Sequence, residues 1–278
     1  MPWRDDPAPY KVLVSEFMLQ QTQVATVIPY FERFLRRFPT LAHLARARQE
    51  SVLKLWEGLG YYARARNLHR AARQILADYD GQIPGDPARL QTLPGLGPYT
   101  AGAVAAIAFG VPAAAIDGNV IRVIGRLRGR TTPDRSPRQL AGIARFLAPA
   151  IRTQPPSAFT QALMELGALV CKPRRPDCAL CPIRLHCAVG RRPASTPLPA
   201  TPARRKPVPH QRIAVGIVWR GNRFLIARRR EDQMLGGLWE FPGGKRRGHE
   251  SLAQTAAREI REETGLRVTV GKPLITVK

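Results

Sequence analysis

The sequence predicts a mainly α-helical protein followed by a smaller domain of mixed α and β structure. Residues 9–187 carry apolar residues at helical spacing and contain no convincing strand, whereas residues 213–227 alternate as strands do. Between these two patterns, residues 188–211 hold six prolines among small and basic residues, which is typical of a semi-rigid linker. Length alone allows about two domains. We therefore expect domains at residues 1–187 and 212–278.

The helices of the first domain are expected in order along the chain. Residues 10–37 form an amphipathic pattern, in which Val12, Phe17 and Phe31 share one apolar face. Gly110 and Pro112 end the last clear pattern of this region, because both residues are poor helix formers. The further helical patterns cover residues 51–58, 62–79, 87–93 and 99–109.

The second domain reads as a short α+β unit. Strands are expected at residues 213–219 and 223–227, joined by a turn at Gly221 and Asn222, and a helix is expected at residues 251–264. Another strand-like run covers residues 274–277. Because no closing element follows it, we expect this second domain to be incomplete and the chain to be a fragment of a longer protein.

The charge balance points to a polyanionic partner. Lys and Arg number 44 against 20 Asp and Glu, which gives a net charge of +24. Arginine binds phosphate oxygens in pairs, so nucleic acid is the leading expectation. A generally basic surface, produced by a composition rich in Ala, Pro and Arg, is the alternative. The sequence shows neither an apolar run of membrane-spanning length nor a signal-peptide pattern, so we expect a cytoplasmic protein, nucleoid-associated if bacterial.

All four cysteines lie within one short segment. They are spaced as C-x6-C-x2-C-x5-C and are Cys171, Cys178, Cys181 and Cys187. Such a cluster has no distant partners for disulfides and indicates a metal site. A tetrahedral zinc ion is one alternative, but zinc sites usually use two separate C-x2-C pairs. A [4Fe–4S] cluster is therefore the expected cofactor.

A glycine-rich turn joins two of the expected helices. It reads Leu-Pro-Gly-Leu-Gly-Pro-Tyr-Thr-Ala over residues 93–101. The glycines let backbone N–H groups at the start of the second helix approach a phosphate oxygen, and the helix dipole adds to the attraction. A glycine-rich turn between helices is also common without function. The residues of this turn expected to contact DNA are Leu93, Gly95, Gly97 and Thr100.

Five motifs in sequence order resemble the helix-hairpin-helix DNA glycosylase superfamily, and two of them narrow the resemblance to the adenine DNA glycosylase family. The narrowing motifs are Val-Ser-Glu-Phe-Met-Leu-Gln-Gln-Thr-Gln-Val at residues 14–24 and Gly-Leu-Gly-Tyr-Tyr-Ala-Arg-Ala-Arg-Asn at residues 58–67. The others are the glycine-rich turn, Ile-Asp-Gly-Asn-Val at residues 116–120 and the cysteine segment. The resemblance implies removal of adenine opposite 8-oxoguanine or guanine in double-stranded DNA, by a monomer.

Cleavage of an N-glycosidic bond needs an acid for the leaving base and an anion for the cationic sugar. Glu16 lies in an apolar segment, which favours its protonated form, and resembles the acid of the family. Asp117 resembles the carboxylate that stabilises the sugar, and Asn119 resembles its neighbour. A helical Glu paired with Arg, and an Asp that caps a helix, are the alternatives.

Tyr99 and three further residues are assigned by the same resemblance. Relatives of the endonuclease III type carry a nucleophilic Lys where this chain has Tyr99, so we expect a glycosylase without strand cleavage. An adenine must leave the duplex before it reacts. Gln20, Gln21 and Tyr61 match family residues that wedge into DNA, although ordinary surface glutamines and a packed tyrosine would look the same.

Residues 244–266 fit every fixed position of the Nudix box, G-x5-E-x7-R-E-U-x-E-E-x-G-U. Glu259, Glu262 and Glu263 follow helical spacing and are expected to face a possible Mg2+ ion. In the resembled family this domain recognises 8-oxoguanine and its metal box is usually eroded, whereas here it is intact. The alternative function is therefore a Nudix pyrophosphohydrolase of oxidised nucleotides with a DNA-binding helical domain.

Overall fold

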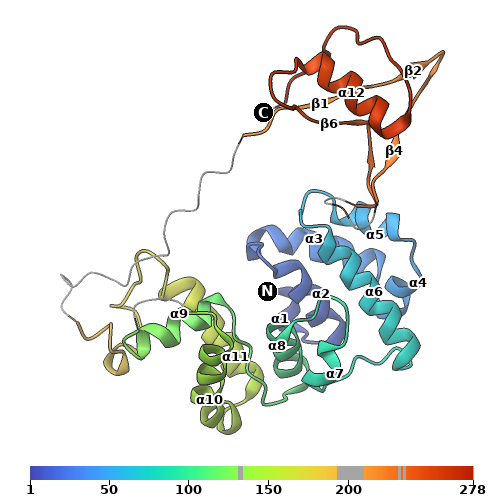
Figure 1. Cartoon of the computed structure of the whole chain (residues 1–278). Helices are drawn as coiled ribbons and strands as arrows, with labels where there is room; N and C mark the ends of the chain where they lie inside the picture. Colours follow the sequence, from blue (N-terminus) through green and yellow to red (C-terminus); the bar gives the residue numbers. More distant parts are fainter. Residues whose placement is uncertain (131–133, 193–209, 231–232, 234–235, 278) are drawn as a thin grey trace. The chain divides into compact units, whose positions relative to one another are not determined.

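The computed structural model describes residues 1–130, 134–192, 210–230, 233 and 236–277 (Figure 1). The chain divides into two compact units, Met1–Ala203 and Arg204–Lys278. The first is helical and the second combines short strands with one helix, which confirms the predicted fold class. Most of the predicted linker, residues 193–209, lies outside the described residues, so the domain limits stay a prediction.

The described part of the first unit contains eleven α-helices. They are α1 (Pro2–Asp5), α2 (Pro9–Leu19), α3 (Val24–Arg37), α4 (Leu41–Arg46), α5 (Gln49–Trp56), α6 (Ala63–Asp78), α7 (Pro87–Gln91), α8 (Pro98–Phe109), α9 (Gly118–Leu127), α10 (Pro137–Thr153) and α11 (Pro156–Glu165). A π-helical turn at Leu166–Val170 and a 3-10 turn at Arg184–His186 follow. None of the helices in the described residues is long and apolar enough to cross a membrane.

The prediction of one helix over residues 10–37 is wrong. The chain ends α2 at Leu19, turns, and begins α3 at Val24. Gln21 has a φ of 59°, in the left-handed region, and a right-handed helix cannot continue through that conformation. The break leaves a short exposed segment directly after the helix that carries Glu16.

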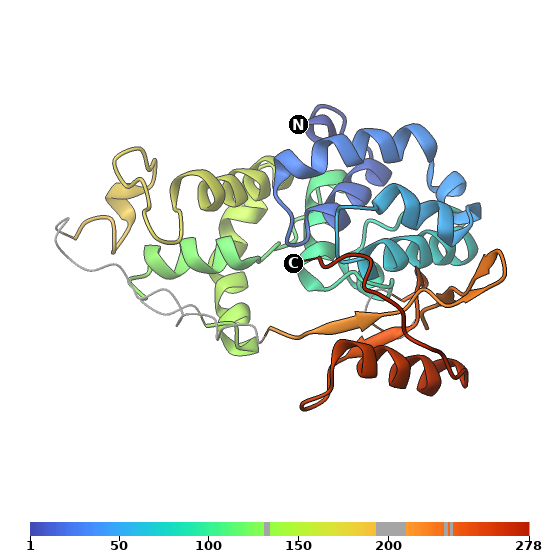
Figure 2. The same ribbon diagram turned by 90° about the horizontal axis from the view of Figure 1, so that it is seen from above.

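Helix α8 lies at the centre of one half of the first unit. Its residues from Thr100 to Ile107 are all buried, as expected for a helix that is apolar on every side. It packs against α2, α7 and α11. Helices α9 and α10 share a second apolar cluster. Figure 2 shows α9–α11, green to yellow, grouped apart from the blue and cyan helices α2–α6.

The described residues of the second unit form three short antiparallel strand pairs. They are β1 (Ile213–Val215) with β6 (Gly243–Lys245), β2 (Trp219–Arg220) with β3 (Arg223–Phe224), and β4 (Ala227–Arg228) with β5 (Trp239–Glu240). Helix α12 (Leu252–Thr264) packs on β1 and β6, and Ser251 caps it. Residues 213–219 and 223–227 are therefore interrupted strands rather than continuous ones.

The strand predicted at residues 274–277 is wrong. Leu274 and Ile275 are 80% and 81% exposed, and this segment pairs with no strand in the described part of the chain. Strand formation depends on hydrogen bonds to a neighbouring strand, so an alternating sequence alone is insufficient.

Candidate functional site

Glu16 lies in α2 with only 4% of its surface exposed. Its Oε2 atom has no hydrogen-bond partner among the described residues. Burial raises the pKa of Glu16 to about 7; the negative charge of Asp117 adds to this effect, and a hydrogen bond with Tyr99 opposes it. A carboxyl group with this pKa is partly protonated at neutral pH and can donate a proton.

Asp117 stands at the start of α9. Its Oδ1 atom accepts a hydrogen bond from the Val120 N–H at 2.7 Å, and its Oδ2 atom accepts one from Asn119 Nδ2 at 2.7 Å. The capping role considered for Asp117 is therefore present. The cap also fixes the carboxylate, and its negative charge adds to the rise that burial produces in the pKa of Glu16 and of Tyr99.

The glycine-rich turn packs directly on the helix that carries Glu16. Gly95 has a φ of 81°, and a Cβ atom at this position would lie 2.8 Å from Cε1 of Phe17 and 2.7 Å from Cβ of Asn67. Only glycine fits such an approach. Leu93 is 2% exposed and anchors the turn in the core.

The start of α8 leaves backbone donors before its first intrahelical bond. Gly97 is the N-cap, and the Ala101 N–H donates to the Gly97 carbonyl at 3.0 Å. The amides of Tyr99 and Thr100 precede that bond. A helix start with such donors attracts anions, since the helix dipole points its positive end there.

The three expected wedge residues occupy two neighbouring segments. Gln21 and Tyr61 are exposed, and both have a positive φ, of 59° and 49°. Gln20 is half-buried, and its Nε2 atom donates to Thr100 Oγ1 at 3.3 Å. The structure thus joins the segment after α2 to the start of α8.

The four cysteine side chains line one cavity. Burial raises the pKa of Cys178, and the negative charges of the other three thiolates add to the shift. No group of three or more His, Cys, Asp or Glu residues within the described ranges is arranged to hold a single metal ion. Four thiols around one cavity are the donor set from which both an iron–sulfur cluster and a tetrahedral zinc site are built.

Two arginines of α9 that sequence reasoning missed bind the cysteine segment, and the first of them also binds Asn119, the neighbour of Asp117. Arg122 donates to Asn119 Oδ1 at 2.8 Å and to the carbonyl of Cys171 at 2.8 Å. Arg126 is buried and donates to the carbonyl of Lys172 at 2.7 Å and to Cys171 Sγ at 3.3 Å. The available signal was their position on α9, three and seven residues after Asn119, which places all three on one helix face.

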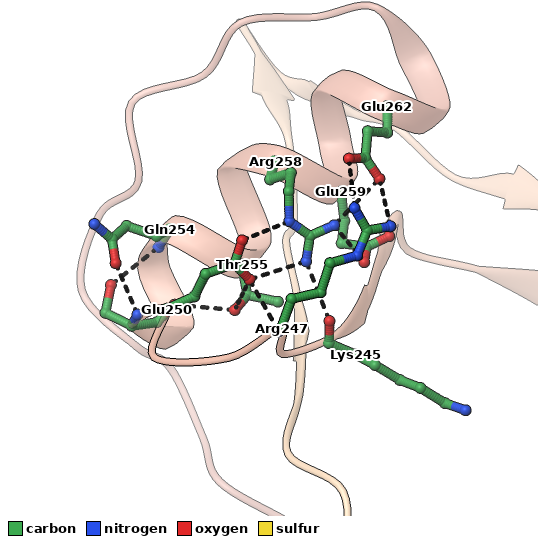
Figure 3. A network of polar contacts seen from close by, with 9 residues as sticks. Lys245, Arg247, Glu250, Gln254, Thr255, Arg258, Glu259 and Glu262 are labelled. Carbon is green, nitrogen blue, oxygen red and sulfur yellow. Dashed lines mark hydrogen bonds and ion pairs between the residues drawn. The ribbon is translucent and has the colours of Figure 1, made fainter.

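The structure gives no support to a Mg2+ site in the Nudix box. The expected ligands were Glu259, Glu262 and Glu263. Arg258 donates to Glu259 at 2.8 Å. Arg247 donates to both carboxylate oxygens of Glu262, at 3.0 and 3.1 Å. The Gly243 N–H donates to Glu263 at 3.0 Å. Figure 3 shows Arg247 and Arg258 beside the carboxylates of Glu259 and Glu262. Arg258 also donates to Glu262 at 3.1 Å, so the acids are already paired within one network. Glu250, whose pKa two bonds from Arg258 help to lower to about 2, joins this network.

Two family models match the chain. The model described as "HhH-GPD superfamily base excision DNA repair protein" matches residues 14–145, and a "NUDIX domain" model matches residues 209–276. The first match contains Glu16, the glycine-rich turn and Asp117, and the second contains the arginine-bound acids.

Proteins named adenine DNA glycosylase are similar to this chain over most of its length. The one from Homo sapiens is 37% identical, with 92% of this chain and 57% of that protein covered. The one from Buchnera aphidicola subsp. Schizaphis graminum is 32% identical, with 87% of this chain and 70% of that protein covered. The chain thus spans little more than half the length of the human relative.

Among solved structures, a non-covalent endonuclease III–DNA complex is similar to the helical unit. Its TM-score is 0.56 at 27% identity, and the match covers 66% of this chain and 84% of that one.

Proposed function

The chain belongs to the adenine DNA glycosylase family, and on that premise we propose that it excises adenine from DNA by hydrolysing the N-glycosidic bond. The observation that carries the proposal is the pairing of a buried, partly protonated Glu16 with the N-cap carboxylate of Asp117, whose charge adds to the rise in the pKa of Glu16. An acid and an anion are what departure of a base from an oxocarbenium-like sugar requires.

Each residue of the site has a role in the proposed reaction. Glu16 donates a proton to the departing adenine, and Asp117 stabilises the positive charge that develops on the sugar. Asn119 holds the Asp117 carboxylate through its 2.7 Å hydrogen bond. Tyr99 tunes the acidity of Glu16, because its interaction with that carboxyl opposes the rise in pKa that burial produces.

The proposed substrate is double-stranded DNA with adenine opposite 8-oxoguanine or guanine. The exposed Gly97 at the start of α8 supports a contact with backbone phosphate, whereas the side chain of Thr100 is buried, so only its backbone N–H is proposed to take part. The exposed Tyr61 and Gln21 support a wedge at the lesion. The net charge of +24 adds sequence-independent attraction. We propose a monomer that acts in the cytoplasm, at the nucleoid if bacterial.

The proposed cofactor is a [4Fe–4S] cluster held by the four cysteines around their shared cavity. When bound, it would cross-link a segment that has few apolar contacts of its own. Arg126 holds the same segment by donating to the carbonyls of Lys172 and Pro173 at 2.7 and 2.6 Å. We also propose that residues 1–187 and 212–278 are separate domains, with residues 188–211 as their linker.

Tyr99 supports a glycosylase that leaves the DNA strand intact, because a phenol cannot form a Schiff base. The test is incubation with an end-labelled duplex that carries adenine opposite 8-oxoguanine, with adenine opposite thymine as the control. We expect strand breaks only after alkali treatment and no covalent product with borohydride. Breaks without alkali would contradict the absence of strand cleavage, and a folded, DNA-bound chain that forms no abasic site would contradict the proposed activity.

A further inference from the structure

Arg64 is a buried charge that the proposed reaction does not use. It is the second residue of α6 and only 6% exposed. Its guanidinium donates to six oxygen atoms, five from backbone carbonyls and one from the Thr22 hydroxyl. A planar guanidinium with five N–H donors can bind several acceptors at fixed angles.

One side of the guanidinium binds the end of α2 and the segment after it. The Nη1 atom lies 2.6 Å from the carbonyl oxygen of Met18, 2.5 Å from that of Gln20 and 3.0 Å from Thr22 Oγ1. Carbonyl groups at a helix end lack intrahelical partners, and a cation there satisfies them. Arg64 therefore fixes the backbone that carries Gln20 and Gln21.

The other side binds the segment before α6. The Nη2 atom lies 3.3 Å from the carbonyl oxygen of Leu59 and 3.1 Å from that of Gly60. The guanidinium also stands over the rings of Trp56 and Tyr61, at 5.6 and 5.5 Å from their centroids. Cation–π contacts of this kind orient an aromatic ring. Arg64 therefore contacts both the backbone just before Tyr61 and the ring of Tyr61.

Both segments contain a strained residue. In the described chain only Gln21, Tyr61 and Asp80 are non-glycine residues with a positive φ, and the first two belong to the segments that Arg64 joins. Such conformations are unfavourable for residues with a side chain and persist only where neighbouring groups hold them. The Arg64 side chain binds the backbone next to both Gln21 and Tyr61.

We propose that Arg64 is a positioning residue for lesion recognition, which clamps residues 20–22 and 59–61 into one rigid DNA-facing surface. This inference rests on the proposed function and deepens it. The clamp keeps the exposed Gln21 and Tyr61 in place before DNA arrives, so that little conformational entropy is lost on wedging. A lysine at this position keeps the charge but carries one compact ammonium group, which cannot reach both segments.

The test compares Arg64→Lys with the parent chain and with Arg73→Lys, the same substitution at an exposed arginine of α6. The first readout is amide hydrogen exchange in the free protein. We expect residues 20–22 and 59–61 to exchange faster together in Arg64→Lys, with the middle of α6 and the Arg73→Lys control unchanged. Faster exchange in one segment only, or in neither, would overturn the clamp whether or not the parent excises adenine.

The second readout is the ratio of affinities for a duplex with adenine opposite 8-oxoguanine and for a fully paired duplex. A merely structural loss would lower both affinities by the same factor. We expect the ratio to fall about tenfold in Arg64→Lys, with paired-duplex binding within about twofold of the parent. Thr22→Val, which removes one acceptor of Arg64 and keeps the arginine, should lower the ratio about threefold if Arg64→Lys does not fold. Parent-like ratios in both variants would refute the inference, whereas a parent without any preference would refute the proposed function.

Discussion

The burial of Glu16 makes catalysis depend on pH in a direction that can be stated. Its pKa is raised to about 7, so the acid form dominates below that pH and is lost as the pH rises through it. We expect kcat/KM for adenine excision to fall about tenfold per pH unit above this value. The measurement is adenine release between pH 6 and about 9 at constant ionic strength.

Tyr99→Phe supplies the control for that pH dependence. The Tyr99 hydrogen bond lowers the pKa of Glu16, because it favours the ionised carboxylate. Its loss should therefore raise the pKa further and move the alkaline limb to higher pH. A shift to lower pH, or no limb at all in the parent, would show that Glu16 is not the titrating acid.

Sequence reasoning singled out the candidate carboxylates and thiols, but not the buried arginines that bind the segments around them. Glu16, Asp117 and the cysteines stand in motifs of fixed spacing, which a single sequence displays. Arg64 and Arg126 bind mainly backbone carbonyl oxygens, and most of these belong to residues more than forty positions away in the sequence. Every residue type offers that acceptor, so no pattern marks such a partner in advance.

The helices were predictable in kind and less so in extent. The helix end predicted at Gly110 agrees with the structure, because Gly110 forms a left-handed C-cap. The helix predicted at residues 251–264 also agrees, because Ser251 begins it with a capping box. The break between α2 and α3 was missed. It depends on Gln21 in a strained conformation that the distant Arg64 helps to hold, which is a tertiary effect.

The glycine-rich turn offers a matched pair of substitutions. Gly95→Ala places a methyl group against Asn67 and Phe17 at a φ of 81°, so we expect a loss of about 2–4 kcal/mol in the free energy of unfolding. Gly97→Ala meets nothing within 4 Å at a φ of −75° and should cost less than about 1 kcal/mol. Urea unfolding measures both. Equal losses would contradict the close packing of the turn on α2.

The cysteine segment should lose its cofactor when one ligand is removed. In Cys178→Ser we expect iron content to fall well below the roughly four atoms per chain of an intact [4Fe–4S] cluster, with loss of the visible absorption of the cluster. Ser157→Ala, on α11 and outside the cysteine segment, is the control. Zinc in place of iron in the parent chain, purified without oxygen, would refute the proposed cofactor.

The molecule as a whole is strongly basic, and its affinity for DNA should therefore depend on salt. Neutralising 6–10 phosphates costs about 10³–10⁵ in affinity between 50 and 200 mM salt. The measurement is titration of a fully paired duplex by fluorescence anisotropy at several salt concentrations. An affinity that hardly changes with salt would mean that the net charge of +24 is a solvated surface without a nucleic-acid partner.

The two-part architecture followed from a change of composition, since helical spacing gives way to prolines and then to alternation. The composition and motifs did not predict which groups the acids of the Nudix box bind. Its motif predicts carboxylates on one helix, but not that Arg247 and Arg258 bind them. Such pairing is decided by side-chain packing after folding.

The central claim is that Glu16 and Asp117 together excise adenine. The most direct measurement is single-turnover release of adenine from an adenine–8-oxoguanine duplex by the parent, Glu16→Gln, Asp117→Asn and the exposed-site control Glu32→Gln. We predict that the parent and the control react at similar rates and that each site variant loses at least about 10²-fold in rate while still binding DNA. Parent-like release by either folded site variant would contradict the account.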